Sequence, residues 1–210
     1  MSTKNFSFKP ALLILLAVVL MSYACTRVED NTRAGSLLVV SNVIGIDNTG
    51  LSGVPLFSDL CERTPPTCGC GIVNDNAQAD FSNEFLQIGP GAGLGNGSFM
   101  NDIIVQQYRV DYFRPNNRNT PGVDVPYGID GTMSLRVPVN GSASGVVTIV
   151  RHEAKVEAPL SDLVQLGPQE GTITTNAQIK FYGQDISGHT VSAFGFLEVH
   201  FADFADTGCN

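Results

Sequence analysis

The sequence predicts an all-β protein, an antiparallel β-sandwich of about seven short strands. Segments in which apolar and polar residues alternate recur along the chain, and a period of two is typical of strands that bury one face. Turn-forming residues separate these segments, among them 22 glycines and 11 prolines. Long runs of strong helix formers are missing. These features together favour two packed antiparallel sheets over a helical fold.

The chain begins with the pattern of a secretion signal. Lys4 and Lys9 give it a positive start, and residues 11–21 are uninterruptedly apolar. At about 1.5 Å of rise per residue this apolar run would cross only about half of a bilayer core. It therefore fits a signal peptide better than a membrane span.

Cys25 resembles the lipid-attachment cysteine of bacterial lipoproteins, in which a small residue precedes a cysteine that receives diacylglycerol. Ala24 is such a residue, whereas Ser22 and Tyr23 differ from the Leu and the small residue usual there. Without Cys25 the other four cysteines form an even set, and residues 26–35 are polar like a solvated tether. The alternative is an ordinary signal-peptidase site, which would leave Cys25 unmodified and the protein secreted with one spare thiol.

These features divide the chain into a signal peptide (residues 1–24), a lipidated tether (25–35) and a β-sandwich domain (36–210). Removing the signal leaves 186 residues, enough for one domain with a core. The resemblance implies stable anchoring by several acyl chains, without a transmembrane helix. Thr26 is not the Asp that commonly retains lipoproteins at the inner membrane, so the resemblance implies the outer membrane, with the domain facing the periplasm or the cell surface.

The mature chain is acidic. Its formal net charge of −8 becomes −10 once the two lysines of the signal are removed. Such a surface repels phosphate backbones and anionic lipids, so we expect no nucleic-acid partner and no membrane contact besides the lipid.

The N-terminal part of the domain is predicted to combine strands with a disulfide-pinned loop region. Residues 36–46 are rich in β-branched side chains and precede a turn at 47–50, so they should form the first strand. Residues 51–70 hold three prolines and three cysteines, which indicates irregular backbone, with a short strand after it at 71–73. Residues 79–88 are predicted to form the second strand.

A glycine-rich segment, residues 89–97, follows this strand. Phosphate-binding loops are also glycine-rich, but this segment has no G-x-G-x-x-G register and no following G-K-S/T. We interpret it as a connection between strands, for which glycine is the usual residue.

Residues 102–113 have the clearest alternation and predict a half-buried strand. Its inner face is predicted to carry Ile104, Tyr108, Val110 and Tyr112. A polar loop with three prolines follows over residues 114–130. Residues 133–139 then alternate again, and Pro138, which lacks a ladder donor, indicates an edge strand or a strand end.

Residues 140–145 are predicted to be a turn, and residues 146–157 one long or two short strands. Residues 159–167 begin with Pro and end with Gly, with apolar residues at helical spacing, so they predict a short helical turn. Residues 172–182 and 190–201 alternate on either side of a glycine-bearing turn and predict a hairpin, with Gln178, Lys180 and Tyr182 pointing outward.

This hairpin, with its Asp-x-x-Gly turn at Asp185 to Gly188, resembles the last two strands of bacterial immunoglobulin-like domains, which implies an immunoglobulin-like sandwich. The Cys…Trp…Cys core of antibody domains is missing, because the chain has no Trp. The whole chain is similar to bacterial envelope lipoproteins of uncharacterised activity, chiefly through residues 121–131, 150–155 and 181–185. This resemblance implies a location and a fold.

Four cysteines remain after Cys25: Cys61, Cys68, Cys70 and Cys209. A metal site is one interpretation, but the C-x6-C-x-C spacing is not that of structural zinc, and an exported chain meets oxidising conditions. We therefore predict two disulfides, and a redox role for the cluster is a further hypothesis. Because Cys68 and Cys70 are too close to pair without strain, one should bond to Cys61 and the other to Cys209, in an order that the sequence leaves open.

No catalytic site is predicted. The three histidines, His152, His189 and His200, form neither H-x-x-x-H nor H-E-x-x-H, and no G-x-S-x-G occurs. An acid–base patch of Arg151, His152 and Glu153 would need one shared face, whereas neighbours in a strand alternate faces, so we interpret these residues as a solvated charged patch.

Calcium is the remaining candidate ligand, since six aspartates fall in predicted turns: Asp47, Asp75, Asp80, Asp124, Asp130 and Asp185. No EF-hand-like loop occurs, and aspartate is an ordinary turn residue, so we predict no metal and no cofactor.

The leading hypothesis is a non-enzymatic, lipid-anchored β-sandwich that binds or scaffolds an envelope protein, a polysaccharide or a surface structure at the outer membrane. The alternative is a small hydrolase or carbohydrate-active enzyme on the same scaffold. That alternative requires a pocket in which His152 or His200 meets a nucleophile or close carboxylates.

Overall fold

The computed structural model describes residues 35–46, 52–86, 97–166, 170–206 and 208–209. Contacts divide the chain into two units, Met1–Arg33 and Ala34–Asn210, and every described residue belongs to the second. The predictions for the signal peptide, Cys25, the turn at 47–50 and most of the glycine-rich segment lie outside the described residues. Within the described ranges, no helix is both long and apolar enough to cross a membrane.

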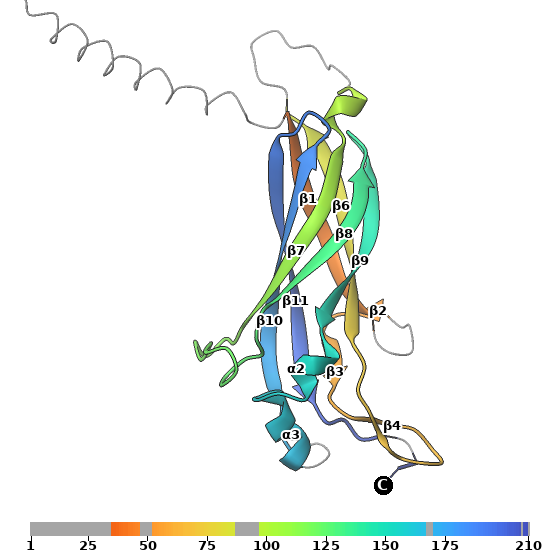
Figure 1. Cartoon of the computed structure of the whole chain (residues 1–210), viewed down its shortest axis with the longest axis vertical. Helices are drawn as coiled ribbons and strands as arrows, with labels where there is room; N and C mark the ends of the chain where they lie inside the picture. The colour runs from red at the N-terminus through yellow and green to blue at the C-terminus, as the bar shows by residue number, and fades with distance from the viewer. Residues whose placement is uncertain (1–34, 47–51, 87–96, 167–169, 207, 210) are drawn as a thin grey trace, which may run out of the picture. The chain divides into compact units, whose positions relative to one another are not determined.

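The second unit is mostly β-structure, in two main sheets (Figure 1). The four-stranded sheet contains, in spatial order, β2 (Ser52–Gly53), β1 (Ser36–Ile46), β6 (Asp75–Phe85) and β9 (Ser142–Val150). The five-stranded sheet contains β3 (Leu56–Asp59), β11 (Thr190–Ala202), β10 (Ile173–Asp185), β7 (Ile103–Phe113) and β8 (Ile129–Val137). The all-β prediction is thus confirmed.

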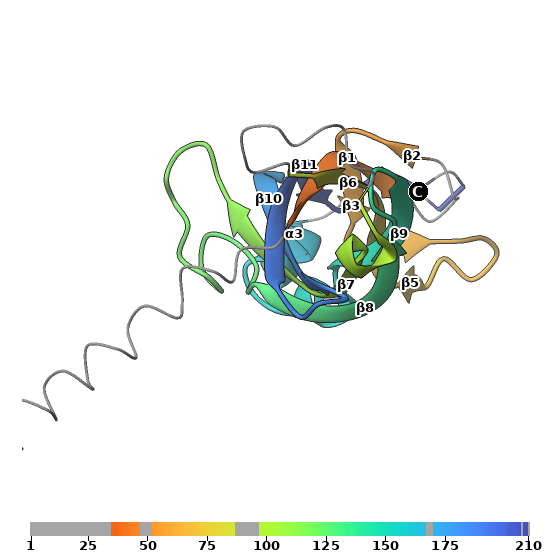
Figure 2. The same ribbon diagram turned by 90° about the horizontal axis from the view of Figure 1, so that it is seen from above.

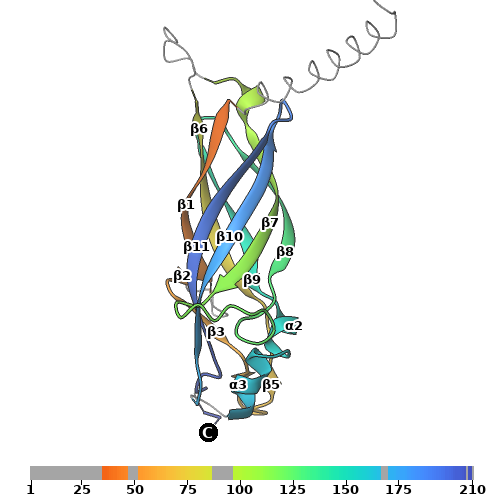
Figure 3. The same cartoon turned by 90° about the vertical axis from the view of Figure 1, so that its left-hand side faces the viewer.

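Smaller elements complete this unit. A two-stranded ribbon pairs β4 (Glu62–Arg63) with β5 (Cys70–Gly71). The helical elements are η3 (Phe99–Asn101), α2 (His152–Lys155) and α3 (Leu160–Leu166). The strands of the five-stranded sheet run side by side in Figure 3, and all of its pairings are antiparallel except that of β3 with β11.

The two sheets enclose a common apolar interior (Figure 2). Strand alternation sends every second side chain inward, so β6 contributes Phe81 and β10 contributes Phe181, both fully buried. Their rings meet edge to face with centroids 4.8 Å apart. Such a pair adds about 0.5–1.5 kcal/mol to the stabilisation that burial itself provides.

Two tyrosines of β7 connect the sheets. The Tyr108 hydroxyl accepts a hydrogen bond from the backbone N–H of Thr148 over 3.0 Å, and the Tyr112 hydroxyl donates to the carbonyl of Ile149. Burial raises the pKa of Tyr112, which keeps its hydroxyl a donor. Backbone groups at the free edge of β9 are therefore satisfied by side chains of the opposite sheet.

Several strand predictions are confirmed. Strand β1 covers the predicted first strand, and β10 and β11 form the predicted hairpin, lengthened to Asp185 and Ala202. Strand β8 lies at the edge of its sheet and ends one residue before Pro138, as the missing ladder donor indicated. The predicted helical turn is α3.

The strand predicted at residues 146–157 is confirmed only as far as Val150, and the turn predicted at 140–145 is confirmed at Asn140 and Gly141 but wrong from Ser142 onward. Strand β9 starts earlier, at Ser142, and ends at Val150, the residue that pairs with the first residue of β6, Asp75. Beyond that point β9 has no partner strand, so the backbone turns into α2, which carries Lys155 inward to the Asp75 carboxylate. The alternation therefore ends at Val150, and Lys155 is buried from the helix that follows.

The inner face predicted for β7 is wrong over the first residues of the strand. A register shift between Val105 and Gln107 marks a β-bulge, so Ile103 and Val105 are buried where Ile104 was expected. One extra residue in a strand reverses the side to which the preceding side chains point. After the bulge, Tyr108, Val110 and Tyr112 are buried as predicted.

The disulfide-pinned segment is less irregular than predicted, because β2, β3 and β4 lie within it. The short strand expected at 71–73 is β5, at Cys70–Gly71. The predicted second strand, 79–88, is β6, which starts four residues earlier and ends at Phe85.

Candidate functional site

The outer surface of the five-stranded sheet carries exposed aromatic side chains. They are Phe57, Phe113, Tyr182, Phe194 and Phe196, which are 55%, 43%, 36%, 47% and 57% exposed. Inward positions of the same strands hold buried residues such as Ile179 and Leu197, so alternation places all five rings on one side of the sheet. We call this surface the aromatic face.

Polar side chains lie between the rings of the aromatic face, because strand register sets them in rows. One row across β7, β10 and β11 holds Arg109, Lys180 and Phe194, and the next holds Asp111, Gln178 and Phe196. Side chains opposite one another in such rows are close enough to contact a common ligand. The face thus offers both apolar rings and hydrogen-bonding groups.

Lys180 is held by the rings beside it. Its ammonium nitrogen lies 4.8 Å from the centroid of Tyr182 and 5.5 Å from that of Phe194. Such cation–π contacts contribute about 0.5–1 kcal/mol at an exposed site. Across the described parts of the chain, no ion pair includes Lys180.

The neighbouring cation, Arg109, is already neutralised. Its guanidinium nitrogens lie 2.9 Å from Asp111 Oδ1 and 3.0 Å from Asp130 Oδ2. The hydrogen bond from its side chain to Asp111, with the charges of both aspartates, raises the pKa of Arg109. Lys180 is consequently the positive group among the described side chains of this face that forms no ion pair.

Two shallow depressions flank the aromatic face. One, of about 330 Å³, lies along the boundary between β1 and β11 and is lined by Val40, Ser41, Asn42, Val43, Val54, Phe194, Gly195 and Phe196. The other, of about 380 Å³, is lined by Gln107, Tyr108, Asp130, Gly131, Thr132 and Tyr182. The rings therefore stand between two grooves, an arrangement that suits an extended ligand.

A buried polar cluster is the second notable group. The Lys155 ammonium lies 2.9 Å from Asp75 Oδ2 and 2.7 Å from the backbone oxygen of Asp59, and the Ser58 hydroxyl donates to Asp75 Oδ2 over 2.6 Å. Burial raises the pKa of Asp75, while Lys155 and Ser58 oppose that rise. Ser58 is 0% and Lys155 1% exposed, so the cluster holds α2 against β3 and β6 and offers no accessible nucleophile.

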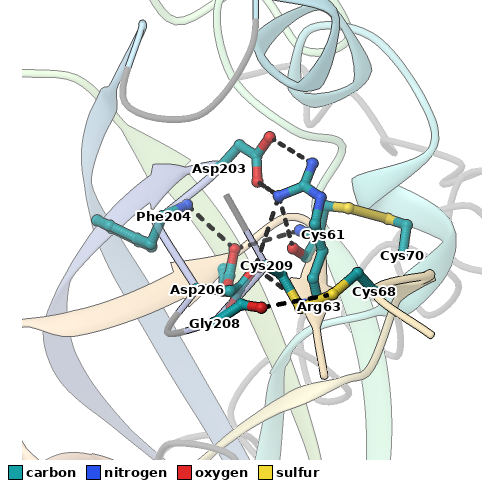
Figure 4. Close-up of polar contacts among 10 residues, drawn as sticks. Cys61, Arg63, Cys68, Cys70, Asp203, Phe204, Asp206, Gly208 and Cys209 are labelled. Carbon is teal, nitrogen blue, oxygen red and sulfur yellow. Dashed lines mark hydrogen bonds and ion pairs between the residues drawn. A yellow bond between two sulfur atoms is a disulfide. The ribbon is translucent and has the colours of Figure 1, made fainter. Parts of the chain in front are cut away.

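The cysteines and the C-terminal residues form a third cluster (Figure 4). Disulfides join Cys61 to Cys70 and Cys68 to Cys209, which is one of the two arrangements that the sequence left open. Arg63 holds Asp203 through two nitrogens, at 2.7 and 2.9 Å, and this hydrogen bonding raises the pKa of the guanidinium. The cluster fastens the last residues of the chain to the β4–β5 ribbon.

The three histidines considered in the sequence analysis lie apart from one another. His152 contacts Asn74 and Glu153 at the start of α2, in a helix and not in the predicted strand. His189 contacts Asp185, and His200 contacts Glu198 over 2.7 Å. None of these histidine contacts includes a serine hydroxyl.

The described aspartates of the calcium hypothesis are dispersed. Asp75, Asp124 and Asp130 form ion pairs with Lys155, Arg118 and Arg109, and Asp80 accepts a hydrogen bond from Ser144. Within the ranges that the structure describes, no group of three or more His, Cys, Asp or Glu side chains could hold a metal ion. Asp47 lies outside those ranges.

Sequence reasoning missed the aromatic face, although the signal was present. Lys180 and Tyr182 point outward as predicted, and Phe194 and Phe196 occupy the outward positions of β11 between buried residues. Phenylalanine at consecutive solvent-facing strand positions is the pattern that indicates the site.

No protein-family model matches this chain, and no curated protein does either.

Proposed function

We propose that this protein is a lipid-anchored envelope protein whose β-sandwich binds its ligand without catalysis, through the aromatic face. The observation that carries the proposal is the set of five exposed rings on a single sheet surface, together with Lys180, which forms no ion pair within the described residues. Exposed aromatic groups gathered on one face mark interaction sites in soluble domains. A sheet holds such groups in fixed positions, which reduces the entropy lost on binding.

The proposed sandwich is immunoglobulin-like. The long strands β1, β6 and β9 lie in one sheet, and β11, β10, β7 and β8 in the other. That order matches strands A, B and E facing G, F, C and C′ in the immunoglobulin topology. The strand order therefore supports the assignment of the two sheets to an immunoglobulin-like topology.

The proposed anchor is a lipid on Cys25 that holds the domain at the outer membrane, facing the periplasm or the cell surface. Its support is the secretion-signal pattern, the polar tether and the pairing of the other four cysteines with one another, which leaves Cys25 as the fifth. Mass spectrometry of the mature N-terminus should find diacylglycerol on Cys25, and C25A should release the protein from the membrane. An unmodified Cys25 would contradict the anchor.

Photo-crosslinking in intact cells tests the binding function. Benzoylphenylalanine in place of Phe196 should give a crosslinked adduct, because a ligand on the aromatic face lies against this ring. The matched control is the same replacement at Tyr127, which is also 57% exposed but lies in the loop before β8. Absence of an adduct at position 196, or equal adducts at both positions, would contradict the proposal.

A further inference from the structure

We infer that the ligand of the aromatic face is an extended polysaccharide that carries carboxylate groups, with sugar rings on Phe194 and Phe196 and a carboxylate at Lys180. This inference rests on the proposed binding function. It adds the chemical class of the ligand and a role for each group on the face.

The geometry of the face suits a polymer. Phe194 and Phe196 are alternate residues of one strand, so their attachment points lie about 6.5–7 Å apart along β11 on the same side of the sheet. That interval is comparable to the length of one sugar unit. The two grooves beside the rings are shallow and open at the surface, which leaves a path for a chain to continue beyond the rings.

The mixture of groups on the face suits a sugar better than a protein. The face of an aromatic ring carries partial negative charge and attracts the polarised C–H bonds on the flat side of a pyranose ring. Hydrogen-bonding partners for the hydroxyls lie in the same rows, since Gln178 is opposite Phe196 and Asn176 is opposite Phe113. The buried centre of a protein interface, in contrast, is depleted of charged groups.

Charge complementarity indicates the carboxylate. Several other described basic side chains are already paired with acids, as Arg63, Arg118 and Arg136 are with Asp203, Asp124 and Asp102. Lys180 instead lies against two rings, with its ammonium free to meet an anion. On a chain with a mature charge of −10, this is the place on the aromatic face where an anionic group of a ligand meets a lysine that forms no ion pair with a described acidic side chain.

The test is a titration of the full chain, purified in mild detergent, with polygalacturonate, alginate and hyaluronate, each alongside its carboxyl-reduced counterpart. F194A/F196A should weaken binding by about tenfold, because two ring contacts are lost. K180Q should weaken binding of the acidic polymers by about two- to fivefold, as expected for one exposed ion pair, and should leave binding of the reduced polymers unchanged. The control Y127A should behave as the wild type.

The outcomes separate this inference from the proposed function. Equal affinity for acidic and reduced polymers, unaffected by K180Q, would overturn the role of the carboxylate. If none of the polymers bound while the crosslink at position 196 still formed and was destroyed by protease, the ligand would be a protein, and the inference would be wrong although the binding function stood. Loss of the crosslink as well would overturn the proposed function itself.

Discussion

Single buried polar residues position helices and strand ends of the described unit. Lys155 is the clearest case, because a lysine is rarely buried unless its charge is paired. Here both carboxylate oxygens of Asp75 lie within 3.0 Å of its nitrogen, and a backbone carbonyl takes a further hydrogen bond. Asp102 has a similar role at the start of β7, where it accepts hydrogen bonds from Arg136 and from the backbone N–H of Val139.

Removing the Lys155 charge should be strongly destabilising. K155M leaves the Asp75 carboxylate buried without its cation, which costs about 3–5 kcal/mol. Urea unfolding of K155M and of the surface control K180M measures the difference, and the control should lose only about 0.5–1 kcal/mol with its cation–π contacts. If K155M does not fold, K155M/D75N removes both charges and should recover part of the loss. Equal stabilities of K155M and K180M would show that the buried pair contributes nothing.

Asp102 should make stability depend on pH in the acid range. Burial acts to raise its pKa, but the hydrogen bonds from Val139 and Arg136 and the charge of Arg136 outweigh burial, so the pKa falls below 3.8. The folded state therefore keeps this carboxylate ionised to lower pH than the unfolded chain does. Its stabilising contribution is present above pH 3.8 and is lost as the pH falls through the lowered pKa.

The comparison that tests this is the free energy of unfolding of D102N and of the wild type at neutral pH and at successive values below pH 4. The gap between the two proteins should narrow as the medium becomes more acidic. A gap that stays constant over this range would mean that Asp102 does not have a lowered pKa.

Whole elements are placed by how closely they can approach one another. Strands β1 and β11 belong to different sheets but lie together at one boundary between the two sheets, where β1 has a bulge between Val40 and Asn42. A side chain on Gly195 would bring its Cβ within 2.6 Å of Val43 Cγ2 and 3.1 Å of Val40 Cγ1. Glycine thus permits the contact that sets the groove beside Phe194 and Phe196.

G195A should therefore destabilise the boundary between the sheets. Overpacking of this kind costs about 1–3 kcal/mol, because Val43 and Val40 must move. The control is G53A in β2, where an added Cβ meets nothing within 4 Å. Thermal or urea unfolding measures both variants, and a G195A protein no less stable than G53A would show that the strands can separate without cost.

At the scale of the whole described unit, the cluster of cysteines and C-terminal residues joins the segment after β11 to the β4–β5 ribbon. The disulfide from Cys68 to Cys209 joins residues 141 positions apart, whereas that from Cys61 to Cys70 spans 9. The ion pair of Arg63 with Asp203 reinforces the same connection. These contacts hold β3 beside β11, and so they support the edge of the aromatic face that carries Phe57.

Loss of the two disulfides should have unequal effects. In the chain-entropy model the long loop is worth about 5 kcal/mol and the short one about 3 kcal/mol. C68S/C209S should therefore unfold at lower urea concentration than C61S/C70S, in buffers without reductant. The reverse order would show that local contacts around the short loop outweigh the restriction of the unfolded chain.

Much of the strand content could be predicted because it depends on local alternation. The β10–β11 hairpin, the edge position of β8 and the α3 helix follow from period-two patterns, Pro138 and a Pro-to-Gly segment. The course of the backbone after Val150 could not be predicted from the sequence. It depends on where the partner strand β6 begins and on the distant Asp75 carboxylate that binds the buried Lys155. The β7 bulge escaped prediction for the same reason, as its register is set by β8 and β10.

The sequence alone determined that the described unit is all-β, where most of its long strands lie, and that Cys61, Cys68, Cys70 and Cys209 form an even set, because composition and alternation are local properties. The predicted signal peptide and the lipid on Cys25 remain predictions. Only the tertiary structure decided which cysteines pair and which outward side chains share a surface. The aromatic face joins Phe57, Phe113 and the β10–β11 hairpin, which are distant in sequence, through strand order and register. Strand order and register depend on packing between segments that are distant in sequence, which local residue patterns do not reveal.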